Sequence, residues 1–191
     1  MVSKREIYQP MEQEFTITAF SENSIGLLNR ITIIFTRRHL NIDSLTVSES
    51  AIKGIYKFTI VTRTTRAMIQ KVEKQIEKLV DVLKAFSLST EDIIHQEVAL
   101  YKVPTEVLTA SNEIESLVRK HNARILEVTP DYTVLEKTGH KAETQELFDS
   151  LYRFGVLQFT RSGRVAITKG KEEYFTQFLK KLDNEKAKVE S

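Results

Sequence analysis

Residues 15–47 of the chain are FTITAFSENSIGLLNRITIIFTRRHLNIDSLTV, and their hydrophobic spacing changes twice. In residues 15–20 the apolar side chains alternate, which is the two-residue period of a β-strand. From Leu27 to Phe35 the apolar residues recur every three or four positions, which predicts a helix with a basic end at Arg37 to His39. Ile42 to Ser48 is again typical of a strand. The stretch therefore predicts a strand, a helix and a second strand in succession.

The next segment completes the same unit. A turn at Ala51 to Gly54 leads into a partner strand at Ile55 to Val61. An apolar stripe with lysines and glutamates on its other face then predicts a second helix. The stripe consists of Met68, Ile69, Val72, Ile76, Leu79 and Val80. With a fourth strand at Val82 to Leu88, residues 14–90 have the order βαββαβ of a ferredoxin-like domain.

The same order recurs in residues 97–170. Strands are predicted at Glu97–Val103, Arg124–Thr129, Thr133–Thr138, Val156–Thr160 and Arg164–Thr168. A helix marked by Ile114 and Leu117 begins near Ser111 or Asn112, either of which can cap it. Another helix ends at Gly155. The predicted fold class is α+β, with two ferredoxin-like domains joined through the polar residues 90–96.

Both ends of the chain fall outside these two units. Residues 1–13 are predicted to be an N-terminal extension, and residues 171–191 a charged C-terminal helix or tail that frays from Leu182 onward. Each four-stranded sheet has helices for one face alone. The other face needs a partner, so association is expected.

Composition excludes several classes of function. The chain has no cysteine, which rules out disulfides and thiolate chemistry, and its net charge of +2 is too small to indicate nucleic-acid binding. Neither an apolar signal segment nor a run of about 20 apolar residues is present. The expected location is cytoplasmic, with no membrane contact.

Other motifs of the sequence do not indicate catalysis, metal binding or RNA binding. The four histidines, at positions 39, 95, 121 and 140, have no metal-ligand spacing, and no nucleophile elbow occurs. Glu73 and Glu77 among lysines predict a solvated, ion-paired helix face. The strand KGIYKF (53–58) lacks the stacking aromatics of RNA-binding domains, because Ile55 and Lys57 occupy those positions.

The basic segment TRSGRVAITKGK (160–171) has three readings. It can bind an anion or an acidic protein surface, since four cationic side chains surround two glycines. Alternatively, it is a basic hairpin whose arginines are solvated. If the family resemblance below holds, contact with a catalytic subunit is the third reading.

The turn SENSIG (21–26) can bind an anion. A helix start offers free N–H groups and the positive end of the helix dipole, which suit a carboxylate or a phosphate. Asn23 can cap the helix, Gly26 allows close approach, and Leu27 and Leu28 can form apolar walls. The alternative is that Ser-Glu-Asn is a plain cap and that Asn41 is a turn residue.

Three segments of the first domain carry a family resemblance: SENSIGLLNRITIIFTRR (21–38), LNIDSLTV (40–47) and QIEKLVDVLK (75–84). They resemble the ACT domain of acetolactate synthase small subunits, the regulatory subunits of acetohydroxyacid synthase. The second domain is similar to that family in RILEVTP, LEKTG and FGVLQFTRSGRVAITKG (124–130, 135–139 and 154–170). The resemblance covers roughly residues 14–170. The chain departs from the family at Ser24-Ile25 and at His39-Leu40, where the family has glycine followed by an aromatic residue.

The resemblance implies a site shared by two chains. ACT domains of this family pair side by side as a homodimer and hold valine at the junction. The implied effector-binding residues are Asn23, Ile25, Gly26, Leu27 and Leu28 of one chain with Asn41 and Ile42 of its neighbour. No catalytic and no metal-binding residue is implied.

The resemblance also implies a function. The chain is expected to be a non-catalytic regulatory subunit that activates the large catalytic subunit and makes it sensitive to a branched-chain amino acid. Thiamine diphosphate, magnesium and FAD are expected in the catalytic partner, and no cofactor in this chain. The alternative is a stand-alone amino-acid-sensing ACT protein that regulates another enzyme or transcription.

Overall fold

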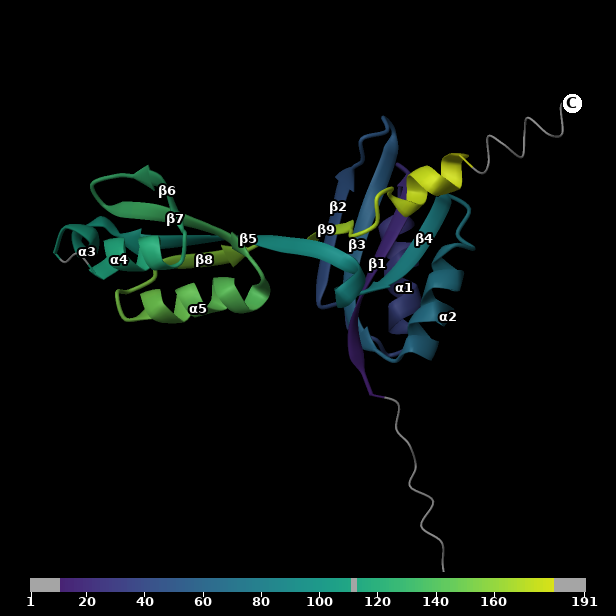
Figure 1. Cartoon of the computed structure of the whole chain (residues 1–191), viewed down its shortest axis with the longest axis horizontal. Coiled ribbons are helices and arrows are strands. Elements are labelled where there is room, and N and C mark those ends of the chain that lie inside the picture. Colours follow the sequence, from purple (N-terminus) through teal and green to yellow (C-terminus); the bar gives the residue numbers. More distant parts are fainter. Residues whose placement is uncertain (1–10, 111–112, 181–191) are drawn as a thin grey trace, which may run out of the picture. The chain divides into compact units, whose positions relative to one another are not determined.

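The computed structural model describes residues 11–110 and 113–180. Predictions for residues 1–10, for a helix cap at Ser111 or Asn112, and for the tail from residue 181 lie outside the described residues. The chain forms two compact units (Figure 1). The first contains the residues up to Ile94 together with those from Ile167 onward, and the second is His95–Ala166. Residues 167–170, which the sequence placed in the second domain, thus belong to the first unit.

The first unit has the predicted βαββαβ order. Its elements are β1 (Gln13–Glu22), α1 (Leu27–Thr36), β2 (Ser44–Glu49), β3 (Ile55–Thr64), α2 (Arg66–Ile76) and β4 (Val82–Ser89). The antiparallel sheet has the strand order β2-β3-β1-β4, so β1 is a central strand and β2 lies at an edge. The ferredoxin-like prediction is confirmed for this unit.

Strand β1 supplies the centre of the first core. Phe15, Ile17 and Ala19 are fully buried and belong to the same cluster as Ile31 of α1 and Ile69 of α2. The predicted alternation places these three side chains on the face that the helices cover. The other face of β1 carries Thr16, Thr18 and Phe20.

The prediction of a solvated, ion-paired face is wrong for Glu73 of α2 and holds only in part for Glu77, the C-cap residue, which is ion-paired but not with a lysine of the helix. Glu73 accepts hydrogen bonds from the backbone N–H of Ser87, at 2.9 Å, and from its hydroxyl group. Glu77 pairs with Lys84. Both carboxylates therefore tie α2 to β4, because a glutamate beside the buried stripe reaches the neighbouring strand more readily than the lysines on the outer face.

The second unit repeats the arrangement. After the short 3₁₀ helix η1 (Thr90–Asp92) come β5 (Ile93–Pro104), α3 (Thr105–Ala110), α4 (Glu113–Lys120), β6 (Arg124–Val128), β7 (Tyr132–Gly139), α5 (Lys141–Tyr152), β8 (Gln158–Arg161) and β9 (Val165–Thr168). The strand order β6-β7-β5-β8 matches that of the first sheet, and β9 also pairs with β5. Residues 90–96, expected as a polar boundary, form η1 and the start of β5.

The reading of residues 160–171 as a basic hairpin is wrong. Both β8 and β9 pair with β5, so Ser162 and Gly163 interrupt one edge instead of turning the chain back. Ser162 is held at this break, because its N–H donates to the carbonyl of Val98 at 2.8 Å and its Oγ accepts from the N–H of Val98 at 2.9 Å. Arg164 is buried instead of solvated.

The C-terminal residues pack on the first sheet. Residues 174–180 form a helix, which is one of the two possibilities expected for this end. The ring of Phe175 stacks on that of Phe20, with centroids 4.1 Å apart and planes 4° from parallel. The sheet face that was expected to need a partner is thus covered at Phe20 by the chain itself.

Tyr101 of β5 provides a test of the second core. It is fully buried, its Oη donates to the backbone carbonyl of Thr144 at 2.6 Å, and burial raises its pKa to about 12. We predict that Tyr101→Phe lowers the free energy of unfolding by about 1 kcal/mol, because it removes one buried hydrogen bond. The control Tyr152→Phe, at a side chain that is 71% exposed, should have no measurable effect. Urea unfolding monitored by circular dichroism measures the difference. Equal urea midpoints for the two variants would contradict a stabilising role of the Tyr101 hydrogen bond.

Candidate functional site

The loop between β1 and α1 is held in place by Arg30. The guanidinium group donates to the hydroxyl oxygen of Ser24 at 3.3 Å and pairs with the carboxylate of Asp81. The backbone N–H of Glu22 donates to the carbonyl of Asp81 at 3.1 Å. The loop is therefore fixed to the turn that precedes β4 before any ligand binds.

The helix α1 is not capped by Asn23, contrary to the sequence prediction. Gly26 is the N-cap residue, with φ 80° and ψ −1°, and no side chain caps the helix. An asparagine at N-cap needs an extended backbone one residue before the helix, whereas this chain enters α1 through a left-handed glycine. The side-chain amide of Asn23, an exposed residue, is therefore not used as the cap.

The start of α1 has the donors that an anion needs. The N–H of Leu27 donates to the carbonyl of Ser24, and the N–H of Arg30 donates to that of Gly26. The N–H groups of Leu28 and Asn29 belong to the first turn, where no preceding helical carbonyl is available. The first turn, Leu-Leu-Asn-Arg, carries no acidic side chain. A carboxylate would therefore meet backbone donors and the positive end of the helix dipole.

The apolar walls differ from those predicted. The side chain of Leu27 is buried in the first core, so it cannot line a pocket at the loop. Ile25 is fully exposed, and Leu28 is also exposed. Ile25 precedes Gly26 and Leu28 follows it by two positions, so these exposed side chains are the ones available to an aliphatic ligand.

The second group of predicted residues lies at the far end of α1. Asn41 and Ile42 follow the helix and precede β2, whereas Gly26 opens it. A helix of ten residues spans about 15 Å, which is several times the length of an amino acid. Asn41 is exposed, while Ile42 is partly buried against the core. One chain therefore does not bring the two groups together.

The residue before this second group has a strained backbone. His39 has φ 54°, in the left-handed region, and its N–H donates to the carbonyl of Thr36 at 3.1 Å. The N–H of Leu40 donates to the carbonyl of Phe35 at 3.0 Å. The two bonds form a Schellman motif, whose left-handed position favours glycine. His39 therefore holds a conformation that glycine takes more easily.

We predict that His39→Gly raises the free energy of unfolding by about 0.5–1 kcal/mol, because glycine takes the left-handed conformation without strain. Asn122 offers a matched control, since it has φ 50° in the equivalent Schellman motif after α4. Asparagine tolerates this region, so Asn122→Gly should stabilise less. Thermal unfolding of the two variants measures the difference, and an unchanged or lower stability of His39→Gly would refute the account.

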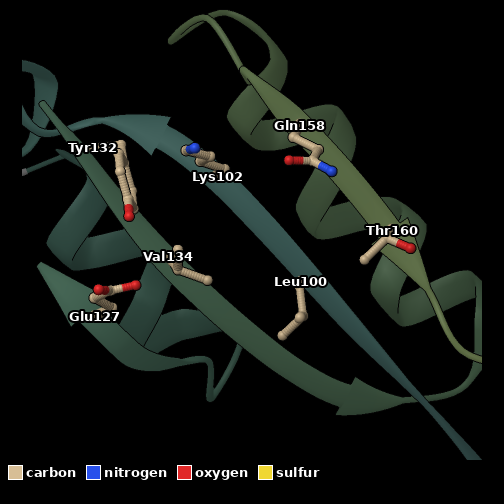
Figure 2. Close-up of a pocket in the computed structure, with 7 residues that line it drawn as sticks. All are labelled: Leu100, Lys102, Glu127, Tyr132, Val134, Gln158 and Thr160. Carbon is tan, nitrogen blue, oxygen red and sulfur yellow. The ribbon is translucent and has the colours of Figure 1, made fainter.

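The second unit has a pocket that sequence reasoning missed (Figure 2). It has a volume of about 230 Å³ and lies on the sheet face away from α5. It is lined by Leu100 and Lys102 of β5, Glu127 of β6, Tyr132 and Val134 of β7, and Gln158 and Thr160 of β8. The Lys102 ammonium lies 3.9 Å from the centroid of the Tyr132 ring, a cation–π contact. The alternation of side chains along the strands could have indicated these lining residues, because those on β5, β7 and β8 are two positions apart and so share one face of the sheet.

Two of the four histidines lie together. Nδ1 of His140 is 3.2 Å from Nε2 of His95, and the ring centroids are 4.5 Å apart. Within residues 11–110 and 113–180, no group of three or more histidine, aspartate or glutamate side chains could hold a metal ion. The same part of the chain contains no helix that is both long and apolar enough to cross a membrane.

Two family models match the chain. Residues 17–84 match the ACT domain of the acetohydroxyacid synthase small-subunit type, and residues 96–170 match the small subunit of acetolactate synthase. The first match lies within the first unit, and the second covers almost all of the second unit and continues to residue 170.

Individual relatives agree with these models. A probable acetolactate synthase small subunit of Methanothermobacter thermautotrophicus is 32% identical, over 81% of this chain and 92% of the relative. The acetolactate synthase small subunit of Bacillus subtilis is 31% identical, over 85% and 94%. The crystal structure of the Thermotoga maritima small subunit superposes with a TM-score of 0.75 at 28% identity, over 84% of this chain and 99% of that one. The chain therefore belongs to the acetolactate synthase small-subunit family, with an N-terminal ACT domain.

Proposed function

We propose that the chain is the non-catalytic subunit that activates the catalytic subunit of acetolactate synthase and makes it sensitive to valine. The observation that supports the effector site is the geometry at the start of α1. Gly26 is the N-cap residue in a left-handed conformation, no side chain caps the first-turn N–H groups, and Ile25 and Leu28 are exposed nearby in the sequence. The ligand's carboxylate would bind these N–H groups, and its isopropyl group would contact the two aliphatic side chains. Asn23 would bind the ammonium or carboxylate group through its side-chain amide.

A homodimer would complete this site. In a two-fold pair formed at the free edge of β2, the α1 helices of the two chains run in opposite directions. The end of one α1 then lies near the start of the other, which brings the neighbour's Asn41 and Ile42 toward Gly26. Strand β2 has neither lysine nor proline to block pairing, and Val47 is exposed on it. Exposed Ile33 of α1 adds apolar surface on the same helix.

Regulation follows from a ligand that contacts two chains. Such a ligand favours one arrangement of the dimer by as much as its affinities for the alternative arrangements differ. The catalytic subunit would be the partner that reads this arrangement. In this proposal thiamine diphosphate, magnesium and FAD belong to that partner, and this chain binds no cofactor.

The direct test is an acetolactate assay with the co-purified catalytic subunit. We expect addition of this chain to raise the activity and valine to lower it again, with leucine and isoleucine as comparisons. Unchanged catalytic activity on addition of the chain would overturn the activating role, and unchanged activity on addition of valine would overturn the effector assignment.

A substitution at Gly26 tests the anion position. We predict that Gly26→Asp weakens valine binding at least about tenfold, because the new carboxylate repels that of the ligand. Gly54→Asp is the matched control, since Gly54 has φ 82° against 80° for Gly26 and both positions have open space for a side chain. Backbone strain is then the same in both variants. If calorimetry gave the same valine affinity for Gly26→Asp and Gly54→Asp, the pocket would be assigned wrongly.

A second substitution tests the contribution of the neighbouring chain. We predict that Asn41→Ala weakens valine binding several-fold, by about 1 kcal/mol for one lost hydrogen bond, without changing the mass measured by light scattering. The fold should tolerate the change, because Asn41 is exposed and its bond from the Thr62 hydroxyl, 2.7 Å long, uses the backbone carbonyl. Mixing Asn41→Ala with Gly26→Asp chains should restore one intact site per mixed dimer. No recovery of valine binding in the mixture would argue against a shared site.

A further inference from the structure

The C-terminal helix, residues 174–180, lies beyond residue 170, where the family match ends. It packs on the face of the first sheet that α1 and α2 do not cover (Figure 1). Phe20 and Phe175, which stack there, are each only 2% exposed. Burial of two aromatic rings is a substantial apolar contact, so this segment is a docked element of the first unit.

The docked segment contacts one complete row of the sheet. Lys57, Phe20 and Lys84 are register partners across β3, β1 and β4. Phe175 stacks on the central Phe20. The carboxylate of Glu173 lies 3.4 Å from the Lys57 ammonium. The Lys84 ammonium lies 5.9 Å from the centroid of the Phe178 ring. Each position of the row is therefore matched by one side chain of the segment.

The next row extends the contact. Phe86, the register partner of Thr18, has its ring centroid 5.4 Å from that of Tyr174. The Lys84 ammonium also lies 5.8 Å from the Phe86 ring. The exposed sheet would thus present two aromatic rings flanked by two lysines. Such a surface is complementary to a short helix that carries aromatic side chains and one acidic residue.

We propose that this face of the ACT sheet is a docking surface for a short aromatic helix, and that the chain's own residues 173–178, Glu-Tyr-Phe-Thr-Gln-Phe, are a displaceable cover of it. Because the cover is tethered, it binds at a high effective concentration and withholds the surface from competing segments. The cover is a single short helix, so it opens at much lower cost than the whole unit unfolds. This inference does not depend on effector binding.

Hydrogen exchange of the full-length chain tests the docking itself. We expect Phe175→Ala to speed exchange of the amides in residues 174–180 at least about tenfold, because the segment loses its buried anchor. Thr176→Ala is the matched control on the exposed side of the same helix, and it should change exchange by less than about twofold. Equal exchange rates in the wild type and Phe175→Ala would overturn the proposal.

A variant that leaves the apolar packing intact guards against general unfolding. Glu173→Lys should speed exchange of the same amides about two- to threefold, since an exposed ion pair becomes a repulsion. Slow exchange of the central β1 amides in each variant shows that the sheet stays folded. Unchanged exchange at 174–180 in Glu173→Lys would contradict the predicted recognition of Lys57 by the acidic residue.

A peptide supplied in trans tests the surface. The probe is a fluorescein-labelled peptide of residues 171–180, KEEYFTQFLK. It should bind full-length Phe175→Ala at least about tenfold more tightly than the wild type, whose own segment competes. The peptide with Phe175→Ala should not bind either chain. If the probe bound neither chain, or bound both equally, the surface would not be a docking site for this sequence.

Discussion

Strand β1 is the constraint on which the first unit depends. It is hydrogen-bonded on both sides, to β3 and to β4. Each of its side chains therefore points either toward the helices or out from the opposite face of the sheet. Phe15, Ile17 and Ala19 fix the helical side. Phe20 has no place in that core, and a large aromatic ring in the middle of the other face is costly to leave in water. The stacking of Phe175 on Phe20 resolves this cost. Two residues after Phe20, β1 ends at Glu22 and the loop to α1 begins, so β1 contributes to the core, contacts the docked helix and leads into the candidate site.

The sequence was sufficient for the elements that have a strong hydrophobic period. Both βαββαβ repeats were predicted, because Ile69, Val72 and Ile76 and their counterparts give a clear helical stripe and the strands alternate. The position of the turn before α1, where the effector site is proposed, followed from the glycine and the apolar run after it. Both sheets have the same strand order, in agreement with the repeated βαββαβ pattern.

Most of the failures have a common physical origin, since they depended on contacts with another element, whereas the Asn23 cap failed for a local reason, the left-handed backbone of Gly26. Glu73 and Glu77 looked solvated because their lysine neighbours are close in sequence, yet their partners Ser87 and Lys84 are on another element. Leu27 looked like a pocket wall because it follows Gly26, but the direction of its side chain is set by the core. Phe175 lies in a charged segment that has no hydrophobic period. Its packing role becomes visible only from its contact with Phe20 in the structure. Local pattern therefore located the candidate site but did not assign its side chains.

The sheet face opposite the helices and the edge at β2 differ in whether the chain itself covers them, and this difference suggests a division of roles. The sheet face opposite the helices is covered at Phe20 and Phe86 by the chain's own helix, so it is not available to a second copy while that helix is docked. The edge at β2 and the neighbouring α1 instead expose Val47, Leu28 and Ile33. In the proposed dimer, association would therefore occur at the edge. A second chain is needed there if one ligand is to contact residues from both ends of α1, because the helix is about 15 Å long. A cover on the face and an uncovered edge would thus favour the one pairing that completes the proposed effector site.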